Sequence, residues 1–327
     1  MFKVSVPASL VWFGEHSILH QKKAIGIAIN NRMTVVLRPR QDQIVTITSL
    51  LGHYQQTIAK LAVVKPFNFV LAAICLFKAQ YAFAFSNGFD IEIEAAFSEK
   101  IGFGSSAAVT AAVIALLYLY IKNEKADNAK ICEQGRTVIQ SIQKIGSGLD
   151  IATSVYGGVI AYQMYPSFEI EPLGIEAQWP GWIAYYCGFK TPTPLVIDKV
   201  LQLQKAKPEL FSKTIDQMGD CTEAAINAIK AQDWPLLGTL MNVNQDLLNT
   251  LGVSLPILEQ LIAELRAFPT ILGAKISGAG LGDCVLGFGK VAVEAINNAS
   301  PKNHTDNNTS LLIPVTLDKE GLRYEPI

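Results

Sequence analysis

Residues 100–108 read Lys-Ile-Gly-Phe-Gly-Ser-Ser-Ala-Ala, and an apolar run without glycine or proline follows to residue 121. That run predicts a buried helix, with Ser105 or Ser106 as its N-cap. The first N–H groups of a helix have no partner within it and carry partial positive charge, so anions bind there. Gly102 and Gly104 let the backbone approach a phosphate because they have no Cβ. We therefore predict a phosphate-binding loop; an ordinary glycine turn with a serine cap is the alternative for this segment alone.

A second glycine loop lies near the C-terminus, where residues 275–284 read Lys-Ile-Ser-Gly-Ala-Gly-Leu-Gly-Asp-Cys. A short run with strand character, residues 285–288, follows it. A tight turn between two strands is the alternative for this loop. Two such loops in one chain favour phosphate binding, because each offers backbone N–H groups that an anion can approach closely.

Three segments resemble, in order, the three motifs of the GHMP kinases, the superfamily of galactokinase, homoserine kinase, mevalonate kinase and phosphomevalonate kinase. Residues 6–16 resemble the N-terminal motif, which ends in Gly-Glu-His. Residues 102–108 resemble the nucleotide loop, and residues 275–284 resemble the C-terminal glycine loop. The order and spacing of the three segments match those of this family over most of the chain. Residues 241–254 resemble the mevalonate kinases in particular.

The resemblance implies an α+β fold with the two-domain GHMP kinase architecture. The N-terminal α/β domain, with a left-handed-crossover-type motif region, would span residues 1–180 and carry the nucleotide loop and the catalytic aspartate. A ferredoxin-like C-terminal domain would span residues 181–327. The cleft between the two domains would hold ATP and the acceptor.

Hydrophobic periodicity predicts the individual elements without reference to any family. Helices are expected over residues 67–82, 107–121, 195–203, 213–229, 234–248 and 256–268. Strands are expected over residues 33–37, 44–47, 91–95, 159–162, 182–187 and 311–315, and a polar loop over 297–310.

The resemblance also implies the site residues and two cofactors, ATP and Mg²⁺. Asp150 would accept or orient the proton of the attacking hydroxyl, and Ser106 would also ligate magnesium. Helix capping is the alternative for Asp150, and also for Thr193, whose hydroxyl could cap a helix starting after Pro194. The implied nucleotide-binding residues are Lys100, Gly102, Phe103, Gly104, Ser105, Ser106, Gly278, Ala279 and Gly280, and the implied acceptor-binding residues are Glu15, His16 and Thr193.

Three positions depart from the family pattern. Ser9 stands where mevalonate kinases have a lysine, and loss of such an electrostatic group commonly costs roughly 3–4 kcal/mol of transition-state stabilisation. Lys100 is one candidate to replace that charge. Residues 139–144 lack the glutamate that mevalonate kinases offer to magnesium. Asp283 replaces a glycine of the third motif, and we expect it to face away from the phosphates, which would repel it.

The resemblance implies an ATP-dependent small-molecule kinase that phosphorylates the primary hydroxyl of mevalonate to give 5-phosphomevalonate in isoprenoid precursor synthesis. Phosphomevalonate kinase, or another GHMP kinase, is the first alternative. A nucleotide-binding protein of low activity is a second alternative of a different class, because both the lysine and the glutamate are missing. The acceptor, the replacements for those two residues, the oligomeric state and any feedback regulation stay open.

The composition of the 327 residues is typical of a metabolic enzyme. The resemblance implies that its partner is a small-molecule alcohol. The net charge is −1, and no basic run indicates nucleic-acid binding. Five scattered cysteines without a Cys-x-x-Cys pair favour reduced thiols and a cytoplasmic location. The apolar run after the glycine loop is short for a membrane span, so we expect no membrane partner. A homodimer is compatible with the sequence.

Overall fold

The computed structural model describes residues 1–96, 101–290, 303–304 and 308–326. Lys100 lies outside these residues, as does most of the loop expected over 297–310. Within that loop, the described residues include two short paired strands, β11 (Asn303–His304) and β12 (Asn308–Thr309).

The larger of two main sheets has eight strands in the order β14-β1-β2-β5-β3-β4, and β6 pairs with both β2 and β7. All pairs are antiparallel except β3 with β5. The long pair β1–β2 forms the spine of this sheet. Strand β1 is buried over most of its length, and β2 is buried from Ala24 to Ile29 and then at Met33, Val35 and Leu37. Its strands are β1 (Phe2–Phe13), β2 (Ala24–Pro39), β3 (Ile44–Ser49), β4 (Gly52–Thr57), β5 (Phe89–Ala95), β6 (Val159–Gln163), β7 (Glu169–Leu173) and β14 (Arg323–Tyr324).

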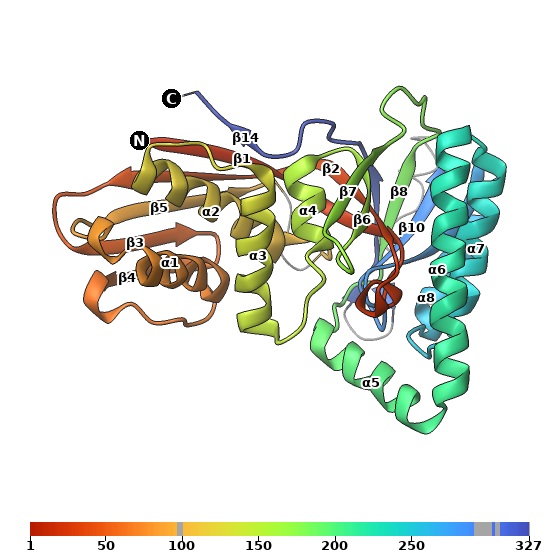
Figure 1. The fold of residues 1–327 in the computed structure, drawn as a ribbon. Helices are drawn as coiled ribbons and strands as arrows, with labels where there is room; N and C mark the ends of the chain where they lie inside the picture. The colour runs from red at the N-terminus through yellow and green to blue at the C-terminus, as the bar shows by residue number, and fades with distance from the viewer. Residues whose placement is uncertain (97–100, 291–302, 305–307, 327) are drawn as a thin grey trace.

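Four helices cover one face of the larger sheet, as Figure 1 shows: α1 (Asn68–Gln80), α2 (Ser105–Lys122), α3 (Asn128–Gln143) and α4 (Leu149–Tyr156). Helix α2 is central and contacts β1, β2 and the other three helices. Its length and composition would allow it to cross a membrane, but 61% of this apolar helix is buried within the fold. Packing in the core therefore accounts for its apolar sequence.

The smaller sheet has the order β13-β8-β10-β9 and is antiparallel throughout. Its helices occupy the right side of Figure 1. The strands are β8 (Trp182–Tyr186), β9 (Ile271–Ser277), β10 (Cys284–Gly289) and β13 (Leu311–Val315). The helices are α5 (Thr193–Ala206), α6 (Pro208–Ala231), α7 (Trp234–Thr250) and α8 (Pro256–Arg266).

Aromatic side chains join the two sheets. Trp12 on β1 lies 5.4 Å from Trp182 on β8 and 5.1 Å from Phe288 on β10, measured between ring centroids. Such packed aromatic contacts fix the position of β1 against the second sheet. The site described below depends on this junction, because it takes residues from both sides.

The predicted division at residue 180 falls between β7 and β8, which belong to different sheets. The last strand, β14, nevertheless pairs with β1 of the first sheet, so the end of the chain rejoins the larger sheet. The boundary itself stays a prediction.

Candidate active site

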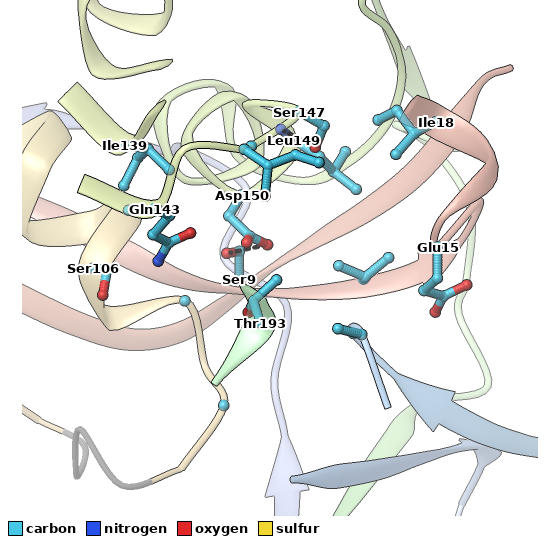
Figure 2. Close-up of a pocket in the computed structure, with 18 of the residues that line it drawn as sticks. Ser9, Glu15, Ile18, Ser106, Ile139, Gln143, Ser147, Leu149, Asp150 and Thr193 are labelled. Carbon is cyan, nitrogen blue, oxygen red and sulfur yellow. Dashed lines mark hydrogen bonds between the residues drawn. The ribbon is translucent and has the colours of Figure 1, made fainter. Parts of the chain in front are cut away.

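A cavity of about 210 Å³ lies where the first turns of α2 and α4 face loops of the smaller sheet. Figure 2 shows Asp150 and Ser9 meeting near its centre, with Ser106, Gln143, Glu15 and Thr193 around them. The wall is built from five separate stretches of chain. Predicted site residues on this wall are Glu15, His16, Gly102, Gly104, Ser105, Ser106, Asp150, Thr193, Gly278, Ala279 and Gly280.

The glycine-serine loop is held against β1. Gly104 is the N-cap of α2 with φ 67°, so the prediction of a serine N-cap is wrong by one or two residues. A Cβ at Gly104 would come within 2.3 Å of Ser9 Oγ, which is why only glycine fits this contact. No side-chain hydrogen bond caps the helix, and Ser105 and Ser106 occupy its first turn beside the cavity. Their hydroxyls and the adjoining N–H groups form an anion-binding end of a helix.

Phe103 contributes to this loop in a different way from its neighbours. Its side chain is buried in the core that joins the sheets and is absent from the described cavity wall. Its carbonyl accepts a hydrogen bond from Ser9 N–H at 3.1 Å. Phe103 therefore anchors the loop to β1.

Asp150 lies in the first turn of α4, whose N-cap is Gly148. No side-chain bond caps this helix, so the capping alternative for Asp150 is wrong. The Asp150 carboxylate instead accepts a long hydrogen bond from Ser9 Oγ, 3.4 Å to Oδ1 (Figure 2). Burial raises the pKa of Asp150, the positive charge of Lys190 opposes that rise, and the nearby Asp283 adds to it. A carboxyl group in such surroundings is suited to accept a proton from a substrate hydroxyl.

The third-motif loop, between β9 and β10, closes the other side of the cavity. Gly278 and Gly280 have φ values of 88° and 92°. The prediction that Asp283 faces away from the site is wrong, because Asp283 lines the cavity. Its Oδ1 accepts a hydrogen bond from Gly102 N–H at 2.6 Å, so the carboxylate satisfies a donor of the nucleotide loop. Burial raises the pKa of Asp283, and Lys190 opposes that rise.

Glu15 and His16, at the end of β1, also contact the third-motif strand and loop. The Glu15 carboxylate forms a fully buried ion pair with Lys275 of β9. Burial raises the pKa of Glu15, and the Lys275 ammonium opposes that rise. Burial lowers the pKa of His16 to about 4, so its ring is neutral at pH 7. Because Nε2 donates to the Ala279 carbonyl at 2.9 Å, Nδ1 is left as an acceptor for a substrate hydroxyl.

Thr193 is the first residue of α5, and its side chain lies on the cavity wall (Figure 2). The capping alternative for Thr193 is wrong. The helix starts at Thr193 rather than after Pro194, and no side-chain bond caps it.

Some polar residues of the cavity wall were not assigned from the sequence, among them Gln143 and Lys190. Gln143 is the last residue of α3, and Figure 2 draws its carboxamide on the same side of the cavity as Ser106. Lys190 follows β8 and lies 3.8 Å from Asp283, measured from Nζ to Oδ2. The only signal in the sequence was their place: Gln143 lies in the stretch without the expected glutamate, and Lys190 precedes Thr191-Pro192-Thr193.

A second cavity adjoins the first. Its wall is mainly apolar, yet Ser105 and Ser106 line both cavities. The two cavities therefore meet at the start of α2, and an elongated ligand with one apolar and one anionic end would fit across them. The apolar wall includes Met33, Phe67, Phe69, Val70, Ile93 and Val109.

Sequence comparison matches this chain to a known protein family. The family model for the GHMP kinases N terminal domain matches residues 68–158, and that for GHMP kinases C terminal matches residues 225–303. The mevalonate kinase of Pyrococcus furiosus is 31% identical and is aligned over 99% of this chain and 98% of its own.

Solved structures share the fold. A mevalonate kinase crystal structure has a TM-score of 0.80 at 21% identity and covers 98% of this chain and 100% of its own. Lactococcus lactis galactokinase complexed with galactose has a TM-score of 0.81 at 17% identity, covering 99% and 95%. Fold similarity therefore spans more than one acceptor class.

Proposed function

Because this chain belongs to the GHMP kinase family, we propose that it is an ATP-dependent mevalonate kinase that phosphorylates the primary hydroxyl of its acceptor. One observation carries the reaction class: Asp150 shares a cavity with the serine-bearing start of α2. A general base and an anion-binding helix end are what phosphoryl transfer to an alcohol requires. The choice of mevalonate rests on the relatives, which are mevalonate kinases aligned over nearly the full chain.

The two adjoining cavities support a placement for ATP. The purine base would occupy the apolar cavity, and the phosphates would lie against Ser105, Ser106 and the N–H groups at the start of α2. At Gly278 no atom lies within 4 Å of the position of a Cβ, so the third-motif backbone would be open to the phosphates there.

The residues present fit a magnesium ion that arrives with ATP. The described residues contain no group of three or more His, Cys, Asp or Glu side chains that could hold a metal. Magnesium bound to nucleotides takes most of its ligands from phosphates and water, so one or two protein oxygens suffice. Ser106 offers a hydroxyl oxygen, and Gln143 offers a carboxamide oxygen on the same wall. When bound, the ion would neutralise charge on the β- and γ-phosphates.

Asp150 would act on the acceptor. Its carboxylate takes the proton of the attacking hydroxyl while that oxygen forms a bond to the γ-phosphorus. The bond between the γ-phosphorus and the β–γ bridging oxygen breaks, and ADP leaves with that electron pair. His16 Nδ1 and the Thr193 hydroxyl would orient the acceptor, since both residues line the cavity.

The alternatives carry less support. Phosphomevalonate would bring an additional phosphate, and Lys190 is the only lysine or arginine among the described residues of the cavity wall. The cysteines support a cytoplasmic location, because none of the five forms a disulfide. The proposed partner is the small-molecule acceptor, and a homodimer stays a prediction.

The proposal is tested by magnesium-dependent ADP release against mevalonate, phosphomevalonate, homoserine and galactose. We expect turnover on mevalonate, and a loss of about 10²–10⁴ in kcat for Asp150→Asn with ATP affinity kept. Asp198→Asn, the same change at an exposed position of α5, is the matched control and should behave as the wild type. Turnover on another acceptor alone would replace mevalonate, and ATP binding without turnover on any acceptor would favour the binding-only alternative.

A further inference from the structure

The cavity is short of positive charge. Three carboxyl groups, from Glu15, Asp150 and Asp283, line its described wall. Lys275 pairs with Glu15 but is fully buried behind it, so that ammonium is committed to a salt bridge. Among the described residues of the wall, Lys190 alone carries a permanent positive charge. Ser9 supplies none, although this position lies between the nucleotide loop and Asp150.

Lys190 is held at the cavity by its backbone neighbours. Cys187 N–H donates to the Asp283 carbonyl at 2.9 Å, and Asp283 N–H donates to the Phe189 carbonyl at 2.8 Å. The Thr191 hydroxyl also donates to the Leu281 carbonyl. These bonds fasten the segment 187–191 to the third-motif loop on both sides of Lys190. The lysine therefore differs from an ordinary surface lysine, whose backbone has no relation to a binding site.

The Lys190 side chain lies beside Asp283, the residue that joins the third-motif loop to the nucleotide loop. Its Nζ is 3.8 Å from Asp283 Oδ2, and the other oxygen of that carboxylate accepts the Gly102 N–H of the nucleotide loop. The Lys190 side chain is 38% exposed. An ion pair that long and that exposed is weak, so little holds the ammonium on Asp283 when a phosphate competes for it. Its charge also acts on Asp150 from this position.

We propose that Lys190 is the cation that contacts the transferred phosphoryl group of ATP, reaching it from the loop after β8 in place of the lysine missing at Ser9. This proposal rests on the proposed function, in that it assumes ATP phosphates lie between the start of α2 and Asp150. Lys190 makes and breaks no covalent bond. It neutralises charge on the γ-phosphate and stabilises the transition state, in which this charge spreads over the equatorial oxygens.

Nucleotide binding tests the proposal without any acceptor. The dissociation constants of ATP and ADP, each with excess magnesium, are measured for the wild type, Lys190→Met and Lys190→Arg. Methionine keeps the length of the side chain and removes its charge, whereas arginine keeps the charge. Lys199→Met is the matched control, because Lys199 is an exposed lysine of α5 that does not line the cavity.

We expect Lys190→Met to bind ATP about tenfold more weakly, because a hydrogen bond to a charged group is lost, with ADP affinity within about twofold of the wild type. Lys190→Arg should keep most of the preference for ATP, and Lys199→Met should keep all of it. With a working acceptor, kcat of Lys190→Met should fall by about 10²–10³. An unchanged ratio of ATP to ADP affinity in Lys190→Met would overturn the proposal.

The outcome is separate from that of the proposed function. If the wild type binds ATP but phosphorylates an alcohol other than mevalonate, the ratio of ATP affinity to ADP affinity in each variant still decides the role of Lys190. If mevalonate is phosphorylated and Lys190→Met keeps the wild-type ratio and kcat, the function stands and Lys190 is a surface residue. Equal weakening of ATP and ADP in Lys190→Met, with Lys190→Arg behaving identically, would indicate a structural role and also overturn the proposal.

Discussion

At the scale of single residues, the site is organised by the charges around Asp150. Its carboxylate lies near one cation, Lys190, and one further carboxyl, Asp283, and it accepts a hydrogen bond from Ser9. Burial raises its pKa, and the two neighbouring charges act on that pKa in opposite directions. A substitution of either Lys190 or Asp283 should therefore change the pKa of Asp150.

This arrangement predicts the pH dependence of catalysis. The base must be ionised, so kcat/KM should fall as pH falls through the raised pKa of Asp150. Lys190 lowers that pKa, so Lys190→Met should move the acid limb of the profile to higher pH. Asp283 raises it, so Asp283→Asn should move the limb to lower pH. Profiles of kcat/KM for the three proteins, measured at fixed ionic strength, check the two directions.

Identical acid limbs in all three proteins would mean that another group controls the profile. His16 is an unsuitable candidate for a limb near pH 6.5, because burial lowers its pKa to about 4. Its neutral ring is instead a fixed hydrogen-bonding group, with Nε2–H held on the Ala279 carbonyl.

At the scale of elements, the site combines two helix starts with one loop. The first turns of α2 and α4 both begin after a glycine of positive φ, Gly104 and Gly148. No side chain caps either helix, so the first N–H groups of both are available to a ligand. The loop between β9 and β10 faces them and is linked to α2 through Asp283 and Gly102.

The tight contact at Gly104 gives a prediction for the nucleotide loop. In Gly104→Ala, the new Cβ would lie 2.3 Å from Ser9 Oγ at a φ of 67°, so the loop must shift away from β1. We expect about a tenfold loss of ATP affinity, corresponding to one lost charge-assisted hydrogen bond. Gly52→Ala is the control, because φ there is also positive but no atom lies within 4 Å. The experiment compares ATP binding and thermal unfolding of both variants.

Gly52→Ala should lose stability only, through its strained backbone. If Gly104→Ala binds ATP as the wild type does, the loop does not hold the phosphates.

The sequence indicated the helices that carry long apolar runs. The helices expected over 67–82 and 107–121 correspond closely to α1 and α2, because each carries a long apolar run. No element was expected over residues 128–143, where the structure has α3. That helix is mostly polar, but its buried residues Ile131, Cys132, Gly135, Val138 and Ile139 recur at helical spacing, so a signal for it was present in the sequence. It forms because it packs against α1, α2 and α4.

The site was less predictable than the elements. The glycines, the serines and Asp150 could be placed through motifs, because each motif is local in sequence. The orientation of Asp283 could not, because its partner Gly102 is 181 residues away. Lys190 and Gln143 were missed for the same reason: a lysine or glutamine acquires a role only when distant segments bring phosphate-binding groups beside it.

At the scale of the whole molecule, the two ends of the chain meet on the larger sheet. β14 pairs with β1, with Tyr324 opposite Val4, and Figure 1 shows the two termini on the same side. Asp318 anchors this tail through a buried ion pair with Arg32 of β2. Arg32 also donates to the carbonyls of Ser5 and Gly321, at 2.9 and 2.7 Å. The tail thus stabilises the strand that leads into the cavity.

Removing this anchor should weaken the fold without changing the chemistry. Asp318→Asn would leave the Arg32 charge nearly buried and unpaired, at a cost of about 3 kcal/mol in the free energy of unfolding. Glu320→Gln, in the exposed pair with Arg323, should cost less than about 1 kcal/mol. Denaturant unfolding measures both, and kcat below the unfolding transition should stay at the wild-type value. Equal stability of the two variants would show that the anchor is dispensable.

The most direct test of the central claim is the phosphorus NMR spectrum of the product formed from ATP and mevalonate. We predict one new phosphomonoester signal, split by the two protons of the adjacent methylene because the phosphate is on the primary hydroxyl, and formation of this signal slower by about 10²–10⁴ with Asp150→Asn. A signal without that splitting, from phosphate on the tertiary hydroxyl, would contradict the assigned reaction. ADP formation without any new phosphoester would contradict phosphoryl transfer to mevalonate altogether.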